Sequence, residues 1–131
     1  MAPPVSKVHP TSPHLTIWRW TLTMAASITH RVTGVMLGAG FLVLGWWLVS
    51  LSAGQDEAEI FTRVAAHPLG QIVLYAFVWA LAFHLLNGIR HLFWDAGYGF
   101  QPPTAKLTGA LVYLGSIVVV ALVFLHVRGI V

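Results

Sequence analysis

The chain has 131 residues, of which 57% are hydrophobic and only 8% are charged. An ordinary soluble domain carries about 25% charged residues, so the composition excludes that class and indicates an integral membrane protein with room for one small domain. The chain has no cysteine, which excludes disulfides, cysteine-ligated iron–sulfur clusters and c-type haem attachment, and its net charge of +3 comes from too few charges to indicate nucleic-acid binding.

The first 24 or so residues form a short amphipathic segment that precedes the apolar part of the chain. Its start, residues 1–7, has neither the apolar stretch and cleavage site of a signal peptide nor the arginines of a transit peptide. We therefore expect a bacterial inner-membrane protein rather than an imported mitochondrial one. Trp18 and Trp20 are of the type that gathers at a membrane interface.

Three stretches without Asp, Glu, Lys or Arg follow, and each exceeds the roughly 20 residues that a helix needs to cross a bilayer. The fold class that we expect is all-α and integral to the membrane, with transmembrane helices over about 25–52, 66–94 and 106–128. The connection 52–63 reads as a loop because it is acidic. The connection 95–106 reads as a loop because glycines and the pair Pro102 and Pro103 break helices.

The basic residues predict the orientation of these helices. Five lie on the side of the N-terminus and two on the other side, which favours a cytoplasmic N-terminus by the positive-inside rule. The first group is Lys7, Arg19, Arg31, Arg90 and Lys106, and the second is Arg63 and Arg128.

A first polar cluster opens the first expected helix. Ser27, His30, Arg31 and Gly34 are spaced i, i+3, i+4 and i+7, so they share one helix face. A hydroxyl, an imidazole and a guanidinium would then point the same way near the interface. The alternative is an interfacial arginine whose charge reaches water, with His30 and Ser27 helping to cap the helix.

A second polar cluster closes the second expected helix. His84, Gly88 and His91 lie at i, i+4 and i+7, with His84 roughly 10 Å deeper in the membrane than His91. A titratable residue at that depth is a functional candidate, and Gly88 leaves room for a large planar ligand. The alternative is a packed core histidine, with Arg90 and Asp95 simply paired at the interface.

Topology places both clusters on the cytoplasmic side, which suits haem together with a quinone. An imidazole at position 84 is an axial-ligand candidate, and Arg31, His30 and His91 could bind the haem propionates. Ser27 and Arg31 are donors suited to quinone carbonyl oxygens. Because His30 and His91 are too shallow to oppose His84, we expect the second axial ligand on another chain.

The sequence resembles the cytochrome b556 subunits of succinate dehydrogenase, the membrane anchors of respiratory complex II. Segments 12–20, 27–34 and 84–97 carry the resemblance: SPHLTIWRW, SITHRVTG and HLLNGIRHLFWDAG. It implies that His84 is a haem b axial ligand, paired with a histidine of a second hydrophobic anchor subunit. It assigns the quinone site to Ser27, Arg31 and Trp20, and the haem surroundings to His30, Arg31 and His91.

The resemblance also implies partners and a function. An iron–sulfur subunit and a flavoprotein subunit would deliver electrons from succinate, and this anchor would pass them to quinone, with ubiquinone expected. Two alternatives remain: a haem-free structural anchor, and a small transporter or proton-pathway subunit that uses the histidines as a relay. The stretch 72–81 disfavours the relay because Tyr75 is its only ionisable residue.

Overall fold

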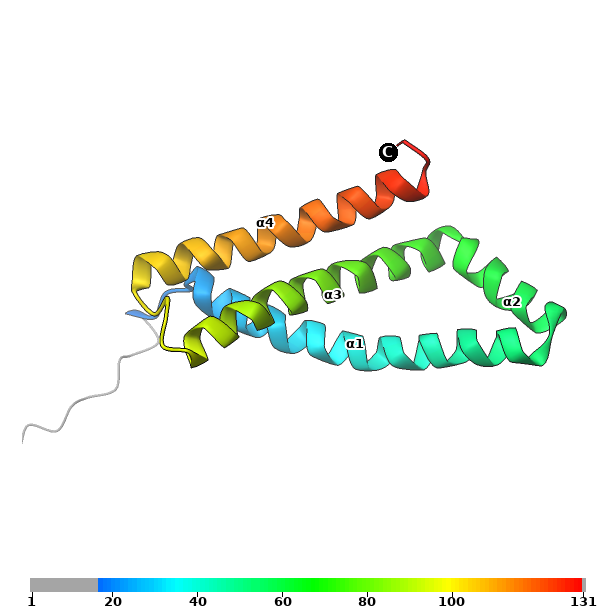
Figure 1. Ribbon diagram of the computed structural model, residues 1–131, viewed down its shortest axis with the longest axis horizontal. Coiled ribbons are helices and arrows are strands. Elements are labelled where there is room, and N and C mark those ends of the chain that lie inside the picture. The colour runs from blue at the N-terminus through cyan, green and yellow to red at the C-terminus, as the bar shows by residue number, and fades with distance from the viewer. Residues whose placement is uncertain (1–16, 131) are drawn as a thin grey trace, which may run out of the picture.

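The structure is a computed structural model that describes residues 17–130. Its helices are α1 (Leu22–Ala53), α2 (Gln55–Ala66), α3 (Pro68–Asp95) and α4 (Pro102–Val127), as Figure 1 shows. Helices α1, α3 and α4 are each long and apolar enough to cross a membrane. The expected N-terminal segment lies mostly outside the described residues, as do Lys7 and the first part of the segment 12–20.

Local sequence explains where the spans begin. Thr21 caps α1 by accepting a hydrogen bond from the backbone N–H of Met24 at 3.3 Å, so α1 begins at Leu22 rather than near residue 25. Pro68 opens α3. Pro102 and Pro103 open α4, where the sequence predicted a loop that continues to residue 106. Proline fits the first helical turn because its fixed φ suits the helix and no backbone donor is lost there.

The expected loop 52–63 is wrong, because most of it is the helix α2. Gly54 separates α1 from α2 with φ of 131°, a conformation that residues with a side chain rarely adopt. Asp56 and Glu57 then lie in the first turn of α2 and Arg63 in its last turn, which complements the helix dipole. Arg63 and Glu59 add an i, i+4 ion pair at 3.5 Å.

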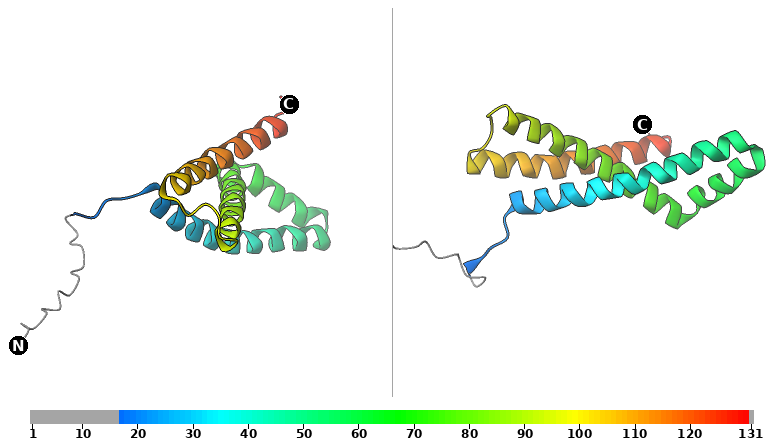
Figure 2. Two further views of the ribbon diagram at one scale, coloured as in Figure 1. Left: turned by 60° about the vertical axis from the view of Figure 1, so that its left-hand side comes forward. Right: turned by 90° about the horizontal axis from the view of Figure 1, so that it is seen from below.

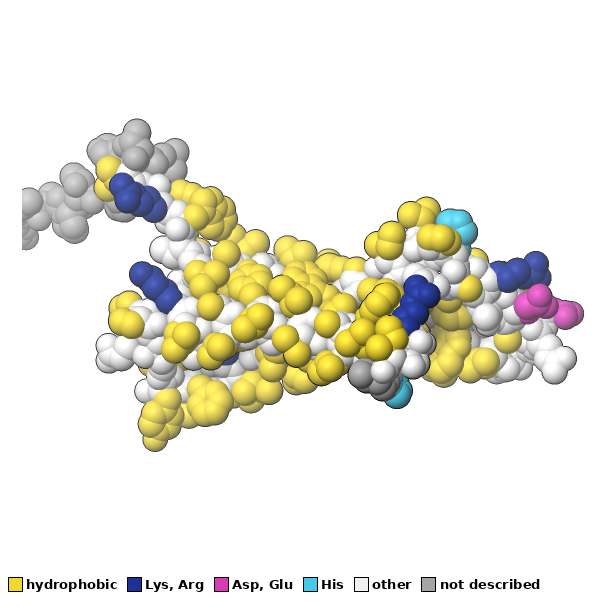
Figure 3. Space-filling view, turned by 90° about the horizontal axis from the view of Figure 1, so that it is seen from above, with side chains coloured by type: hydrophobic (Ala, Val, Ile, Leu, Met, Phe, Trp, Pro, Cys, Tyr) yellow, Lys and Arg dark blue, Asp and Glu magenta, His cyan; other side chains and the backbone are white. Residues whose placement is uncertain are grey.

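Helix α3 lies between α1 and α4 and contacts both (Figures 1 and 2). The starts of α1 and α4 and the end of α3 lie together at what we call the site end. The opposite end, where α2 joins α1 to α3, is the α2 end. Hydrophobic side chains cover the middle of the face in Figure 3, and acidic side chains appear at the α2 end.

The residues buried inside the chain are few and mostly small, which allows the helix backbones to approach closely. They include Ala26 of α1, Ala80, Ala82 and Phe83 of α3, and Ala105 and Val112 of α4. Most other apolar side chains of the spans face outward. In a bilayer this exposed surface meets lipid or the helices of another chain.

Candidate functional site

The deep histidine, His84, is held by α1 through one ring nitrogen. Its Nδ1 lies 3.1 Å from the backbone carbonyl oxygen of His30 and 3.3 Å from Oγ1 of Thr33. The Thr33 hydroxyl donates to the same carbonyl at 2.9 Å. A carbonyl can only accept, so Nδ1 of His84 carries the proton. The other nitrogen, Nε2, then keeps an in-plane lone pair and has no hydrogen-bond partner among the described residues.

Two glycines shape the space around this imidazole. A Cβ atom added to Gly34 would lie 3.1 Å from Cε1 of His84, tighter than ordinary packing, so α1 can approach the ring closely only with glycine here. A Cβ atom added to Gly88 would meet nothing within 4 Å. The surface at Gly88, one helical turn from His84, is therefore open, in line with the room that the sequence predicted.

The three histidines that the sequence singled out form one continuous contact. The rings of His30 and His84 stack with centroids 3.9 Å apart and planes 12° apart, and His30 lies 5.0 Å from His91. His91 in turn stacks on Trp94 at 5.2 Å. The Nδ1 atoms of His30 and His91 are buried and have no hydrogen-bond partner within residues 17–130.

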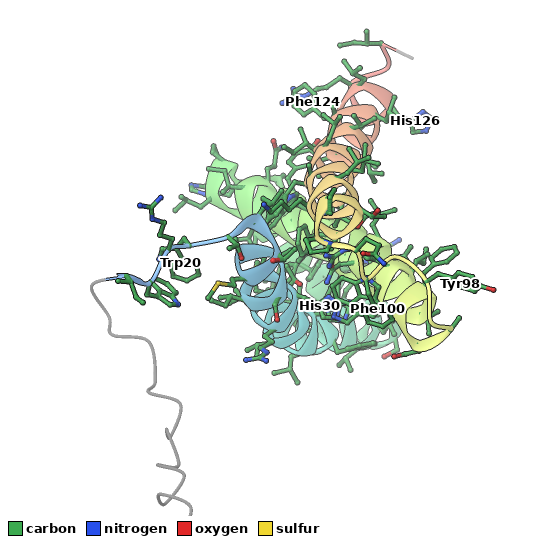
Figure 4. The ribbon with its side chains drawn as sticks, turned by 90° about the vertical axis from the view of Figure 1, so that its left-hand side faces the viewer. Trp20, His30, Tyr98, Phe100, Phe124 and His126 are labelled. Atoms are coloured by element: carbon green, nitrogen blue, oxygen red, sulfur yellow. The ribbon has the colours of Figure 1, made fainter. Side chains whose placement is uncertain are left out.

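The predicted quinone residues are placed less closely together. Ser27 is half-buried and Arg31 is exposed, and neither side chain hydrogen-bonds to any described residue. Arg31 follows His30 directly but is exposed, whereas the ring of His30 stacks on His84 of α3. Trp20 is 63% exposed and contacts Trp18 edge-on at 4.8 Å. It lies on the segment before α1, across α1 from His30 in the view of Figure 4.

The alternative pairing of Arg90 with Asp95 is wrong. Arg90 is buried at 6% exposure and binds α4 instead. Its Nε donates to the Thr108 hydroxyl at 3.0 Å, and one terminal nitrogen donates to the carbonyl of Ala105 at 3.0 Å. The other terminal nitrogen lies 3.3 Å from Oδ1 of Asn87. Asp95 is exposed and forms no ion pair with a described residue.

Sequence reasoning missed four polar residues that organise this end. Thr33, which binds both histidines of the stack, lies at i+3 from His30, a spacing that was readable. Asn87 precedes Arg90 by three residues, which was equally readable. The hydrogen bond between Thr29 and the Tyr113 hydroxyl, at 2.8 Å, joins residues 84 positions apart, and no local pattern signals it.

The donor set fits a haem iron better than a free metal ion. Among residues 17–130 there is no group of three or more His, Cys, Asp or Glu side chains that could hold an ion alone. One imidazole with its Nδ1 proton on a carbonyl is the usual arrangement of a histidine ligand. The expectation that His30 is too shallow to meet His84 is wrong, because the two rings stack. His30 is still unsuited to hold the same iron as His84, because its nitrogen lone pairs lie in the plane of a ring that stacks face to face on His84.

Comparison with known proteins identifies the family. The model of the succinate dehydrogenase/fumarate reductase transmembrane subunits matches residues 6–123. The chain is 42% identical over 115 residues to a succinate dehydrogenase cytochrome b556 subunit of Rickettsia prowazekii, covering 88% of this chain and 90% of that protein. For the Paracoccus denitrificans protein of the same name the identity is 40% over 113 residues, covering 86% and 87%.

A mitochondrial relative is more distant. The chain is 38% identical over 111 residues to the mouse mitochondrial succinate dehydrogenase cytochrome b560 subunit, covering 82% of this chain and 64% of that protein. The family-model match over residues 6–123 includes all the site residues described above. The chain therefore belongs to the family of succinate dehydrogenase/fumarate reductase transmembrane subunits.

Proposed function

We propose that this chain is the haem b- and quinone-binding membrane anchor of a succinate:quinone oxidoreductase. The observation that carries the proposal is the state of His84: its Nδ1 is held 3.1 Å from a carbonyl, so Nε2 is left with a free lone pair. The cytochrome b names of the relatives agree with this reading. The chain supplies the haem and quinone sites of the complex and does not oxidise succinate itself.

His84 would be one axial ligand of haem b, which when bound supplies a one-electron carrier. The carbonyl of His30 fixes the plane of the His84 ring and increases its basicity through the Nδ1 proton. The open surface at Gly88 gives the macrocycle room. A histidine of a second hydrophobic anchor subunit would complete the coordination, because the stacked His30 cannot. His30, His91 and Arg31 would surround the propionates, and the exposed Arg31 guanidinium is the group suited to bind a carboxylate.

Ser27 and Arg31 would bind the quinone, with Trp20 beside its ring. Both donors lie in the first turns of α1 and have no partner among residues 17–130, so they can bind a carbonyl oxygen. The Arg31 guanidinium would polarise that carbonyl and stabilise negative charge that develops on its oxygen during reduction. The position near the end of a span gives the head group access to water for its two protons. From the family resemblance, ubiquinone is the substrate that we propose.

The rest of the complex follows from what this chain lacks. By the family resemblance, an iron–sulfur subunit would bring electrons from a flavoprotein subunit that oxidises succinate, and this chain has no cysteine to hold such a cluster itself. These soluble subunits would cover the site end. We propose that the complex lies in a bacterial inner membrane, with this N-terminus on the cytoplasmic side.

The visible spectrum of the purified complex tests this function. We expect b-type bands on reduction, and we expect His84→Ala to abolish or strongly shift them because the iron loses one of its two ligands. The matched control is His126→Ala, a histidine on α4 near the α2 end, which should leave the bands unchanged. A complex without b-type bands would establish the haem-free anchor instead. Bands that survive His84→Ala intact would show that His84 is not a ligand of the haem iron.

A further inference from the structure

Polar contacts join the three spans pairwise at the site end. His84 of α3 binds the His30 carbonyl of α1, and Arg90 of α3 binds the Thr108 hydroxyl of α4. The third side of this triangle is the hydrogen bond of 2.8 Å between Thr29 of α1 and the Tyr113 hydroxyl of α4. The first contact contains residues of the proposed haem site, whereas the second and the third contain no residue of the proposed sites.

We propose that Tyr113 is a positioning residue, which through Thr29 fixes the rotation of α1 about its axis. That rotation sets the direction of Ser27 and Arg31 and the hydrogen bond between the His30 carbonyl and His84. This inference rests on the proposed function, because it concerns how the haem and quinone residues are aimed.

Helix geometry explains why one hydroxyl can have this effect. Successive helical residues are about 100° apart, so Thr29 and Arg31 point in roughly opposite directions from α1. Thr33, on the same side as Thr29, is fully buried, whereas Arg31 is exposed. Because a helix rotates as a rigid body, any rotation that moves Thr29 away from Tyr113 also changes the direction of Ser27 and Arg31 by the same angle. The backbone carbonyl that binds His84 belongs to His30, the residue between Thr29 and Arg31. A rotation of α1 therefore also moves this carbonyl relative to His84.

The membrane setting increases the importance of this contact. Spanning helices gain no hydrophobic free energy by associating in lipid, so close packing and interhelical hydrogen bonds decide their relative placement. Ala26, the buried neighbour of Thr29 on α1, has no polar atom in its side chain and offers little resistance to rotation. The directional contact between Thr29 and Tyr113 supplies that resistance on the α4 side.

Tyr113 is suited to a clean test because its ring is anchored separately. The ring centroid lies 4.8 Å from that of Phe83, which is fully buried. Tyr113→Phe should therefore keep the ring packing and remove only the hydroxyl. Thr29→Val removes the other partner with little change in shape, and Thr29→Ser keeps a hydroxyl at the same place.

The experiment measures quinone kinetics and the haem potential of the intact complex. We expect Tyr113→Phe to raise the KM for quinone roughly three- to tenfold, the range that interhelical hydrogen bonds in membranes span. Succinate oxidation with a soluble dye should be unchanged. The haem midpoint potential should shift upward, because a weaker Nδ1 hydrogen bond makes His84 a less basic ligand. Thr29→Val should do the same, Thr29→Ser should restore wild-type behaviour, and the double variant should add nothing further.

Tyr75→Phe, which removes a phenol from α3 at the α2 end, is the matched control and should change neither quantity. The proposal is overturned if Tyr113→Phe leaves both KM and potential unchanged, or if the effects of Tyr113→Phe and Thr29→Val add. A wild-type complex without b-type bands would instead refute the proposed function, so the two failures are distinguishable.

Discussion

Two neighbouring residues, His30 and Arg31, lie in different surroundings. His30 stacks on His84 inside the chain, whereas Arg31 is exposed and has no partner among the described residues. Consecutive helical positions differ in direction by about 100°, which is enough to place one side chain against α3 and the other toward a ligand or another subunit. The helix face that the spacing predicted therefore lies at the border between the packed and the exposed side of α1. His30 lies on the packed side and Arg31 on the exposed side.

Replacing Arg31 tests the quinone site at this scale. Arg31→Leu removes the guanidinium proposed to polarise the quinone carbonyl, and a hydrogen bond to a charged group contributes about 1.5–3 kcal/mol. We therefore expect quinone reduction to fall by roughly ten- to a hundredfold, while succinate oxidation with a soluble dye persists. Steady-state assays with the two acceptors measure this directly.

Lys106→Leu provides the control for loss of a positive charge at the site end. Lys106 is an exposed residue of α4, and its removal should leave quinone reduction within about twofold of wild type. Equal loss of dye and quinone activities in Arg31→Leu would indicate that Arg31 serves assembly rather than quinone binding.

At the scale of the helices, the contact between Arg90 of α3 and the start of α4 contains several hydrogen bonds. Its guanidinium donates to Thr108, Ala105 and Asn87, and it lies 3.9 Å from the ring centroid of Trp94. A buried charge is stable only when its donors are used, which these partners achieve. This single side chain therefore fixes the end of α3 against the start of α4.

We expect Arg90→Met to lower the free energy of unfolding by about 1–3 kcal/mol, because the acceptors Asn87 and Ala105 are left without their buried donor. Thermal unfolding of the purified complex measures the change. The control is Arg63→Met on α2, whose ion pair with Glu59 is exposed and should contribute less than about 1 kcal/mol. Equal effects of the two variants would contradict a special role for the buried arginine.

The elements also show what could be predicted from sequence and what could not. The three spans were identified from their apolar composition and from the length of each stretch without charged residues. Both could be read from the sequence because a helix that crosses the lipid must be apolar over about 20 residues. Helix α2 was missed because a short charged segment between spans resembles a loop, and its stability depends on Glu59 with Arg63 and on the packing of Phe61 against Trp46.

Within the candidate site, His84 and His30 were predictable because they follow a helical period. The role of Arg90 was not predictable, since its acceptors lie on α4 and the two helices must pack before the contact exists. The same holds for Thr29 and Tyr113, whose hydrogen bond depends on the placement of α1 against α4. Sequence periodicity identifies which residues share a face, but not which residue of another helix will lie opposite.

For the whole molecule, orientation in the membrane is the main consequence to test. The chain has no cysteine, so a single introduced thiol is the only one that can be labelled within this chain, which is isolated after the reaction. We expect Gln55→Cys, at the start of α2, to react in intact bacterial cells with a maleimide that does not cross membranes. Gln101→Cys, just before α4 at the site end, should be protected until the cells are opened. Labelling in the reverse order would place the N-terminus outside.

The two ends of the bundle differ in stiffness. The hydrogen bonds among α1, α3 and α4 described above lie at the site end, and such contacts fix both distance and angle. At the α2 end, α1, α2 and α3 enclose an apolar groove of about 690 Å³, and apolar contacts tolerate sliding. The hydrogen bonds near His30 and His84 should therefore make the site end the more rigid part of the bundle. We expect changes in bilayer thickness or in neighbouring lipids to shift the helices more at the α2 end, so that the spacing between His84 and the pair Ser27 and Arg31 changes least.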